Sequence, residues 1–485
     1  MDLRTMLGRG ALGVLMVGAL IWPAFWNGQP FFFPDTTAYV RGADAGIQKA
    51  TGVTSSWTPS IIAEPDQTPP DKSHVATRPT SSVEDKSVLS GRSVYYGALL
   101  YLGDRLGRFW PTVVIQALAV VAALGLTLHA LRIPLQPWLP ITALATGALT
   151  TAPFFVSFLT PDIFASITIL GVATVVGIQR RLSSSSYAGW LVLLAAALMF
   201  HATHVLIAIS ALVVAIGVNI VRSSWSNRRG LVLVALAVLV AIVAEAGFGL
   251  LVKRATGFPP IRPPFITARF IEDGPGFAYL RDTCPTNGFK VCEFVDRLPL
   301  PATAFLWETR GVFAASPPST RRELADEQLR FVLSVLRYDP VGQSAASLRN
   351  MLRQLTSMGL SEFNYGETDK RYYRTKVPPE HLVTLEKTAA WRGSFPATFV
   401  AVLTTALFAI ALGYIGSNVF VARRRNSLPP PVLYLTTIIV AGVFINDAIC
   451  GVMSGAFDRY GARVAWLIPL AALLLYIGSR NAPET

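Results

Sequence analysis

The chain has 485 residues, of which 52% are hydrophobic and only 15% charged, and its mean hydropathy is +0.46. These values exclude a soluble globular protein, and apolar runs of roughly 20 residues predict membrane-spanning helices instead of the ~10-residue alternating strands of an outer-membrane barrel. The formal net charge is +13. Because the basic residues cluster between apolar runs, we interpret them as a topology signal and expect no nucleic-acid partner.

The first apolar run extends from Gly10 to Phe25 and follows the basic residues Arg4 and Arg9. A secretory signal peptide begins in the same way, but this run ends without a small-x-small cleavage motif. We therefore expect residues 1–26 to form a retained first transmembrane helix.

Windows of about 19 residues predict an all-α polytopic membrane protein with about ten transmembrane helices. The predicted spans are 10–26, 111–131, 138–157, 161–178, 187–200, 205–221, 231–252, 396–419, 432–453 and 463–479. The segment 187–221 fits either one interrupted span or two short spans hinged at His201-Ala202-Thr203-His204, and the charge distribution favours two.

The short connecting segments on one side of the predicted membrane carry twelve basic residues against only Asp2 and Glu484. The twelve are Arg4, Arg9, Arg132, Arg180, Arg181, Arg222, Arg228, Arg229, Arg423, Arg424, Arg425 and Arg480. This is the positive-inside pattern, and it predicts a multi-pass plasma (bacterial inner) membrane protein of the cell envelope with both termini cytoplasmic.

The two long loops then fall on the extracytoplasmic face. In 27–110, the polar stretch near 51–90 predicts a mobile loop, and the aromatic-rich stretch 94–102 predicts a juxtamembrane helix before helices two to seven (111–252). In 253–395, apolar residues such as Leu348 and Leu352 recur at helical spacing and predict a small helical extracytoplasmic cap, followed by helices eight to ten (396–485).

Three cysteines are too few for a disulfide scaffold, and none has the spacing of a zinc site. Cys284 and Cys292 lie in the second long loop, where an oxidising compartment would permit a disulfide. The enclosed Pro-Thr-Asn-Gly sequence favours a turn. We expect the bridge, and the alternative is two free thiols.

The first loop opens with the sequence Phe-Phe-Phe-Pro-Asp-Thr-Thr-Ala-Tyr, in which the acid is Asp35. An aspartate among aromatic rings just beyond a membrane exit is a candidate general base, because partial desolvation tunes its basicity. The alternative is that Asp35 is the N-cap of a juxtamembrane helix.

The turn between the third and fourth spans repeats the pattern with Pro161-Asp162. Capping would explain Asp162 locally. However, two acids on one face can also supply a base with an electrostatic partner, or two ligands of a divalent cation.

Two histidines, His201 and His204, lie at the same end of the spans. They are candidates for hydrogen bonding a sugar, binding phosphate when protonated, or binding metal; the alternative is a structural role. The metal candidates are Asp35, Asp162, His201 and His204, and no other cofactor is indicated.

The last outward turn contains Arg459 and Arg463, which suit a lipid phosphate, although interfacial pairing and snorkelling are the alternative. Three further polar residues, Glu245, Asn446 and Asp447, lie within predicted spans. We expect them to face the bundle interior.

These features resemble the GT-C superfamily of membrane glycosyltransferases, whose members have many spans, an essential acid in the first extracytoplasmic loop and often a second acid in the next outward turn. Asp35 matches the first acid and Asp162 the second, and Arg92-Ser93-Val94-Tyr95-Tyr96 falls where the family often has an Arg–Tyr juxtamembrane segment. The resemblance covers mainly residues 1–230. Asp35 is not followed by another acid, and the family's soluble carboxy-terminal domain is missing.

The resemblance implies transfer of a sugar from a polyprenyl-phosphate donor to a lipid or glycan acceptor, with Asp35 as general base and Asp162 as its partner. Substrate or donor-phosphate contacts would come from His201, His204, Arg459, Arg463, Tyr39 and Arg92. Two other hypotheses fit the composition: a transporter or flippase for a lipid-linked or anionic solute, with Glu245 and Asp447 on its path, and a noncatalytic assembly protein.

Overall fold

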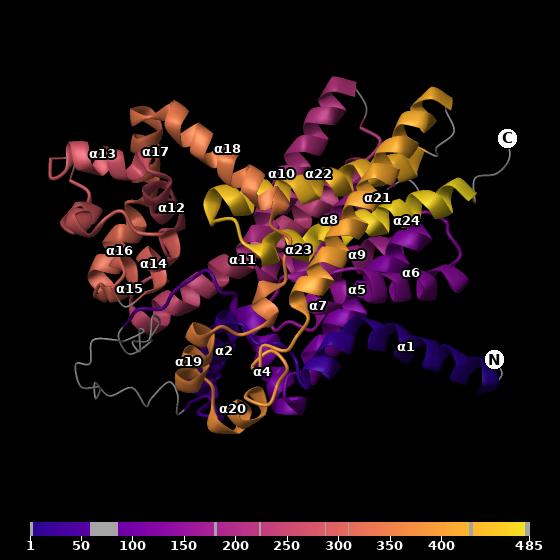
Figure 1. The fold of residues 1–485 in the computed structure, drawn as a ribbon, viewed down its shortest axis with the longest axis horizontal. Helices are drawn as coiled ribbons and strands as arrows, with labels where there is room; N and C mark the ends of the chain where they lie inside the picture. The colour runs from indigo at the N-terminus through magenta and orange to yellow at the C-terminus, as the bar shows by residue number, and fades with distance from the viewer. Residues whose placement is uncertain are drawn as a thin grey trace.

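The computed structural model describes residues 3–58, 86–178, 182–222, 225–286, 288–308, 310–425 and 430–480. These residues are folded into helices, with two isolated β-bridges, Phe31–Phe158 and Leu89–Ile261, and no sheet (Figure 1). An all-helical fold is therefore present, as the sequence predicts. Most of the predicted mobile segment near 51–90, together with Arg180 and Arg181, lies outside the described residues.

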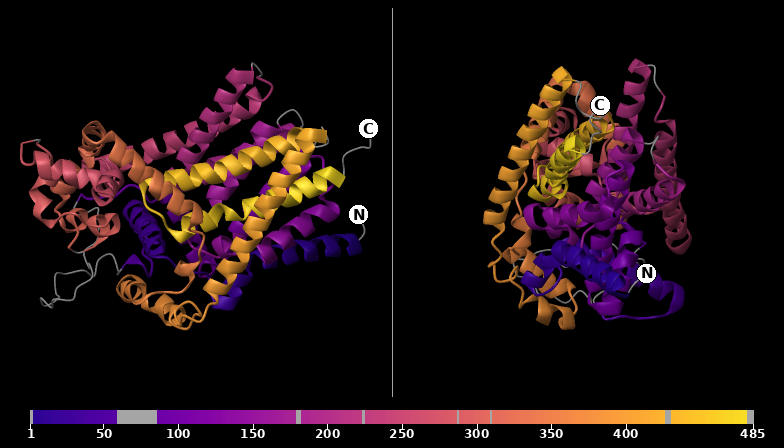
Figure 2. Two further views of the ribbon diagram at one scale, coloured as in Figure 1. Left: turned by 45° about the horizontal axis from the view of Figure 1, so that its top comes forward. Right: turned by 90° about the vertical axis from the view of Figure 1, so that its right-hand side faces the viewer.

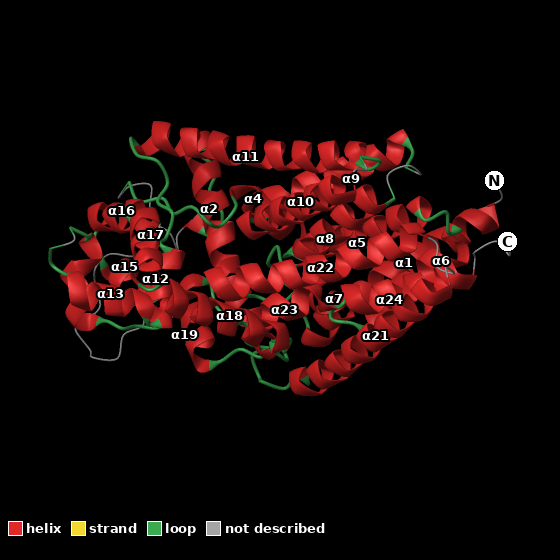
Figure 3. Cartoon of the chain, turned by 90° about the horizontal axis from the view of Figure 1, so that it is seen from above, coloured by secondary structure: helices red, strands yellow, loops and turns green. Residues whose placement is uncertain are grey.

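The first half of the chain forms most of a long bundle. Its helices are α1 (Leu3–Asn27), α2 (Pro34–Thr51), α4 (Val94–Gly107), α5 (Trp110–Ala130), α6 (Leu135–Leu149), α7 (Ala152–Val156), α8 (Ile163–Gly177), α9 (Ser184–Phe200), α10 (Ala202–Arg222) and α11 (Arg228–Thr256). The bundle is completed near the C-terminus by α21 (Ala397–Arg425), α22 (Pro430–Met453), α23 (Asp458–Ala465) and α24 (Leu467–Arg480). Figure 3 shows α11 along one edge of the bundle and α21 along the opposite edge.

Seven stretches in the described residues are long and apolar enough to cross a membrane. They are Gly10–Asn27, Trp110–Ala130, Ala202–Val221, Arg228–Thr256, Ala397–Val421, Val432–Met453 and Asp458–Gly478. Two shorter apolar helices, Ile163–Gly177 and Ser184–Phe200, lie among them. The chain is thus a polytopic membrane protein by composition and helix length.

Two predicted spans differ from the structure. The predicted span 138–157 is broken into α6 and α7, because Thr150 has extended backbone angles and a new helix begins at Ala152, with Pro153 in its first turn. The predicted span 463–479 begins earlier, at Asp458, so the last polar turn is shorter than the sequence suggests.

The break predicted near the two histidines is present. His201 has extended angles (φ −160°, ψ 134°) between α9 and α10, and its Nδ1 accepts the N–H of Thr203 at 3.1 Å. The ring therefore caps the start of α10, and its centre lies 5.3 Å from that of the His204 ring.

Between α11 and α21 lies the α12–α20 region. Its helices are α12 (Phe265–Asp273), α13 (Pro275–Thr283), η2 (Lys290–Arg297), α14 (Ala302–Trp307), α15 (Val312–Ala315), α16 (Pro318–Asp326), α17 (Gln328–Tyr338), α18 (Pro340–Thr356), η3 (Ser361–Phe363), α19 (Glu367–Lys376) and α20 (Pro379–Leu385). An apolar core of its own, which includes Phe305, Phe313 and Phe331, holds α12 to α17 together.

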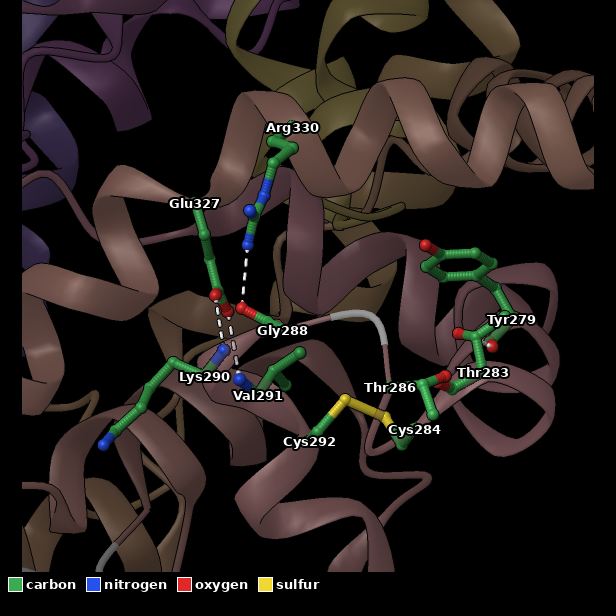
Figure 4. Close-up of a disulfide and its surroundings, with 10 residues drawn as sticks. All are labelled: Tyr279, Thr283, Cys284, Thr286, Gly288, Lys290, Val291, Cys292, Glu327 and Arg330. Carbon is green, nitrogen blue, oxygen red and sulfur yellow. Dashed lines mark hydrogen bonds between the residues drawn. A yellow bond between two sulfur atoms is a disulfide. The ribbon is translucent and has the colours of Figure 1, made fainter.

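A disulfide joins Cys284 and Cys292 inside this region (Figure 4). The segment that it closes is fastened to α17, since the Glu327 carboxylate accepts the N–H groups of Lys290 and Val291 at 2.6 and 3.0 Å. Arg330 adds a hydrogen bond to the Gly288 carbonyl oxygen at 2.9 Å. The bridge therefore closes a loop that packing already anchors.

The two ends of the bundle differ. In Figure 1 and in the left view of Figure 2, the start of α1 and the end of α24 lie at one end, and α12 to α17 lie at the opposite end. We call the end nearest the α12–α20 region the site end. The helices α2, α8, α10 and α23 all begin near it, as the contacts below demonstrate.

Candidate functional site

Asp35 lies in the first turn of α2 but does not cap it. The N-cap residue is Phe33, whose N–H donates to Thr36 Oγ1 at 3.0 Å, and Pro34 is the first helical residue. The Asp35 carboxylate instead accepts hydrogen bonds from Arg92 Nε and Nη2 at 3.0 and 2.5 Å. The capping alternative for Asp35 is therefore wrong, because another residue occupies that position.

The Asp35–Arg92 pair is partly open, with both side chains 26% exposed. Burial raises the pKa of the Asp35 carboxyl, but the nearby charges of Arg92 and Arg459 outweigh burial and hold it below its ordinary value. Asp35 is thus a carboxylate at neutral pH. Of the two predicted acids, Asp35 is the more accessible, since Asp162 is only 6% exposed.

Asp162 stands at the N-cap position of α8, yet its side chain makes no capping hydrogen bond. Its carboxylate accepts from the Thr160 hydroxyl at 2.6 Å and from Arg463 Nη1 at 2.8 Å, and Arg459 Nη1 lies 3.9 Å away. Capping therefore does not explain Asp162 either. Its contacts join the start of α8 to α23 (Asp458–Ala465), which are far apart in the sequence.

Arg463 is 1% exposed and has no room for a substrate. In addition to Asp162, its guanidinium contacts Asn446 Oδ1 at 2.9 Å and Cys450 Sγ at 3.3 Å. All three guanidinium nitrogens donate to buried partners, and the residue lies on α23 and not in a turn. The expectation that Arg463 contacts a donor phosphate is not supported by this geometry, which suits a residue that positions Asp162.

Arg459, one helical turn earlier on α23, has looser contacts. Its guanidinium stacks over the rings of Phe33 and Tyr460 at 4.1 and 4.8 Å, and Nη2 donates to the Tyr460 hydroxyl at 3.2 Å. With one hydrogen bond recorded and an ion pair of 3.9 Å, this arginine retains donors for an anion.

The two histidines differ in environment. Burial, reinforced by the positive charge of Arg463, lowers the pKa of His201 to about 4, and the ring also experiences the charges of Asp162, Arg459 and Asp35. His204 is buried, and one ring nitrogen lies 2.7 Å from the Ala197 carbonyl oxygen. His201 is therefore neutral at pH 7, which argues against phosphate binding by an imidazolium. Nε2 of the buried His204 has no hydrogen-bond partner among the described residues.

Tyr39 and Arg92 complete the set expected from the sequence. Tyr39 lies one turn after Asp35 on α2, is buried, and meets the Tyr96 ring edge-on at 5.2 Å. Burial, together with the charge of Asp35, raises the pKa of Tyr39. Its hydroxyl remains protonated at neutral pH and can only donate or accept a hydrogen bond.

Three residues of the site have no signal in the sequence. Trp307 supports Arg92, whose guanidinium lies 4.8 Å from the centre of the indole ring. Tyr372 shares a hydrogen bond of 2.9 Å with Thr37 on α2. Burial raises the pKa of Glu362, which lies near enough to Arg459 to experience its charge. All three come from the α12–α20 region, which no motif connects to Asp35.

A shared metal ion is not indicated by the side chains. Throughout the part of the chain that the structure describes, no three His, Cys, Asp or Glu side chains are grouped as metal ligands. The candidate ligands Asp35 and Asp162 are each paired with an arginine. We therefore derive no step through a metal ion.

The polar residues expected inside the bundle divide into two cases. Asn446 and Asp447 are buried, and Asn446 Nδ2 donates to the Asp447 carboxylate at 3.0 Å. Glu245 does not face the interior: its side chain is 48% exposed, and its carboxylate lies 4.0 Å from Arg262. The expectation for Glu245 is wrong, because its side chain faces outward from α11. Glu245 therefore does not line a charged path to Asp447, as the transporter hypothesis expects.

Comparison of the chain with protein-family models, curated proteins and solved structures gives no match. The functional argument therefore depends on the geometry of the site.

Proposed function

We propose that this protein is a GT-C-like membrane glycosyltransferase, which moves a sugar from a polyprenyl-phosphate donor to a lipid or glycan acceptor at the extracytoplasmic face. The observation that carries the proposal is the position of Asp35, an accessible carboxylate that is bound by Arg92 and lies near enough to Arg459 to experience its charge. The proposal includes ten spans, cytoplasmic termini and a cell-membrane location, with the α12–α20 region as an extracytoplasmic cap.

Arg92 and Arg459 suit the donor phosphate. Guanidinium groups bind phosphate through paired N–H donors, and both arginines are stacked on aromatic rings that fix their planes. The phosphate of a lipid-linked sugar would compete with Asp35 for these two arginines. Donor binding would thereby free Asp35 and raise its basicity as the acceptor arrives.

The transfer is a single displacement. The acceptor hydroxyl gives its proton to the Asp35 carboxylate while its oxygen forms a bond to the anomeric carbon. The bond from that carbon to the phosphate oxygen breaks, and the polyprenyl phosphate leaves with the electron pair. Arg92 and Arg459 stabilise the charge that develops on the leaving phosphate, and a single base predicts inversion.

Asp162 and Arg463 act as positioning residues in this mechanism. Their buried pair holds the start of α8 against α23, and α23 carries Arg459 one turn before Arg463. The distance between Arg459 and Asp35 therefore depends on this pair.

The test is a donor-consumption assay with purified protein in liposomes and a panel of polyprenyl-phosphate sugars. Asp35→Asn keeps the size of the side chain and removes the base, so we expect wild-type folding with a rate lower by ~10²-fold or more. Asp369→Asn is the matched control, because Asp369 is also an acid in the first turn of a helix, α19, but accepts only the Gly366 N–H.

A folded Asp35→Asn protein that retains more than about a tenth of the wild-type rate would rule out this mechanism. Loss of activity in Asp369→Asn as well would assign the effect to general damage and not to the base.

A further inference from the structure

Helix α18 is amphipathic in the opposite sense from a helix of a water-soluble domain. Its buried face is polar: Gln343, Asn350 and Gln354 are 1%, 3% and 0% exposed. Its exposed side carries leucines, because Leu348 and Leu352 are 52% and 53% exposed beside the exposed Arg349 and Arg353. A helix that packs on a protein core from water shows the reverse arrangement. The periodicity of this segment predicts the helix correctly, but its leucines do not form the core of a cap.

Hydrogen bonds fix the rotation of α18 about its axis. Gln343 and Asn350 donate to the two carboxylate oxygens of Asp273 at 3.0 and 2.8 Å. Gln354 donates to the Phe457 carbonyl oxygen at 3.1 Å and accepts the Phe457 N–H at 2.9 Å. The leucine face therefore cannot turn inward without leaving these buried polar groups unpaired, which is costly.

Helix α18 lies against one of the apolar spans of the bundle. α18 packs directly on α22, whose stretch Val432–Met453 is long and apolar enough to span a membrane. The contact is close, because a Cβ added to Gly451 would lie 2.7 Å from the Asn350 carbonyl oxygen. Figure 3 shows α18 at the same level along the bundle as part of α11, another apolar span.

The preceding helix, α17, also exposes leucines, and exposed arginines lie next to the leucines of α18. On α17, Leu329 is 70% exposed, and Leu333 is also exposed. Arg349 and Arg353 are exposed next to the leucines of α18. Leucines with adjacent arginines are the composition of a helix that lies in a membrane surface, where the apolar side chains enter the acyl boundary and the guanidinium groups meet lipid phosphates.

We propose that α17 and α18 lie in the headgroup region of the leaflet at the site end, with the face formed by Leu329, Leu333, Leu348 and Leu352 in contact with lipid. The surface that this leucine face contacts is that of an anionic lipid bilayer. This proposal depends on the polytopic character of the chain and is independent of the glycosyltransferase proposal. It also connects the bilayer to the site, since Gln354 holds the backbone of Phe457, two residues before Arg459.

The test uses single cysteines labelled with bimane in vesicles of phosphatidylcholine and phosphatidylglycerol. Cys450 is buried and the other two cysteines are bridged, so the label goes to the introduced residue. We expect brominated lipid to quench labels at Leu348→Cys and Leu352→Cys roughly threefold or more beyond a label at the exposed control Asp326→Cys.

Equal quenching at the three positions overturns the proposal. Efficient disulfide-linked dimers of Leu348→Cys also overturn it, in favour of a second copy of the chain on this face. A further arm tests the charge: the double variant Arg349→Gln/Arg353→Gln should lower the ratio of quenching by brominated phosphatidylglycerol to quenching by brominated phosphatidylcholine. An unchanged ratio overturns the assignment of an anionic lipid surface.

Discussion

Asp35 and Asp162 occupy nearly the same place in the sequence pattern, each directly after a proline at the start of a helix, yet their surroundings differ. Asp35 is 26% exposed and bound by one arginine, Arg92, whereas Asp162 is 6% exposed and bound by Thr160 and Arg463. A carboxylate that is open to solvent can separate from its arginine and accept a proton from a substrate. An acid that is enclosed by its partners holds segments together.

The largest effect is expected from breaking the enclosed pair. Asp162→Leu leaves the Arg463 guanidinium buried without a carboxylate, which should destabilise the protein by ~3–5 kcal/mol. The double variant Asp162→Leu/Arg463→Met removes both charges and should recover most of that loss. Unfolding in mixed micelles, followed by circular dichroism, measures both. Equal stability of wild type and Asp162→Leu would contradict the division of roles between the two acids.

The substitution Arg459→Gln tests the proposed phosphate contact of the site. Removing one donor to the leaving phosphate should lower kcat/KM for the lipid-phosphate sugar by ~10²-fold, with folding nearly unchanged. Arg281→Gln is a suitable control, because Arg281 is exposed and pairs only with its neighbour Asp282. A normal kcat/KM in folded Arg459→Gln would remove Arg459 from the donor site.

The pH dependence follows from the lowered pKa of Asp35. The carboxylate stays ionised as pH falls until its folded-state pKa is reached, below the ordinary 3.8, and His201 protonates only near its pKa of about 4. We therefore expect kcat/KM for the free enzyme to be flat from about pH 7.5 to about pH 5. A fall between about pH 7 and pH 6 would indicate an essential histidine of ordinary pKa and would reverse the roles assigned here.

The same shift contributes to stability. Because the folded-state pKa of Asp35 is depressed, its contribution is present above the unfolded-state pKa and is lost as pH falls through the folded-state value. Asp35→Asn should therefore flatten the dependence of unfolding on pH below about 4. An acid unfolding profile identical to that of wild type would contradict the pairing of Asp35 with Arg92.

The smallest effect is expected from the Cys284–Cys292 bridge, which touches neither aspartate. It closes a loop with a sequence separation of 8, so reduction should cost ~2 kcal/mol of stability and leave the rate unchanged. Intact mass after alkylation, with and without reductant, checks the bridge itself. Two alkylated thiols in the unreduced protein would exclude the bridge. Loss of activity on reduction would contradict the expected independence of the rate from the bridge.

The sequence could predict the helices and the acids because both depend on local signals. Apolar length defines most of the spans, and a proline followed by an acid at a helix start marks Asp35 and Asp162. The sequence could not distinguish Arg459 from Arg463, because their difference depends on Asn446 and Cys450 on another helix. The sequence could not predict Glu362 and Trp307 as site residues either, because only the fold brings the α12–α20 region next to Arg459 and Arg92.

Amphipathic patterns were the other source of error. A period of 3.6 residues reports which side chains share a helix face, but it does not report what that face contacts. In α18 the polar face is buried and the leucines are exposed, and Glu245 faces outward although it lies in an apolar stretch. Neither burial pattern can be predicted from the sequence period alone, because the packing of the neighbouring helices determines which face is buried.

Four helices begin at the candidate site, and their backbone dipoles act on any anion that binds there. Asp35, Asp162, His201 and Arg459 lie at the first residues of α2, α8, α10 and α23, or directly before them. Each helix N-terminus carries roughly half a positive elementary charge from its aligned peptide dipoles. This part of the potential belongs to the backbone, so side-chain substitutions leave it in place. A protein that lacks a single arginine should therefore still attract phosphate, with weaker orientation and little change in overall sign.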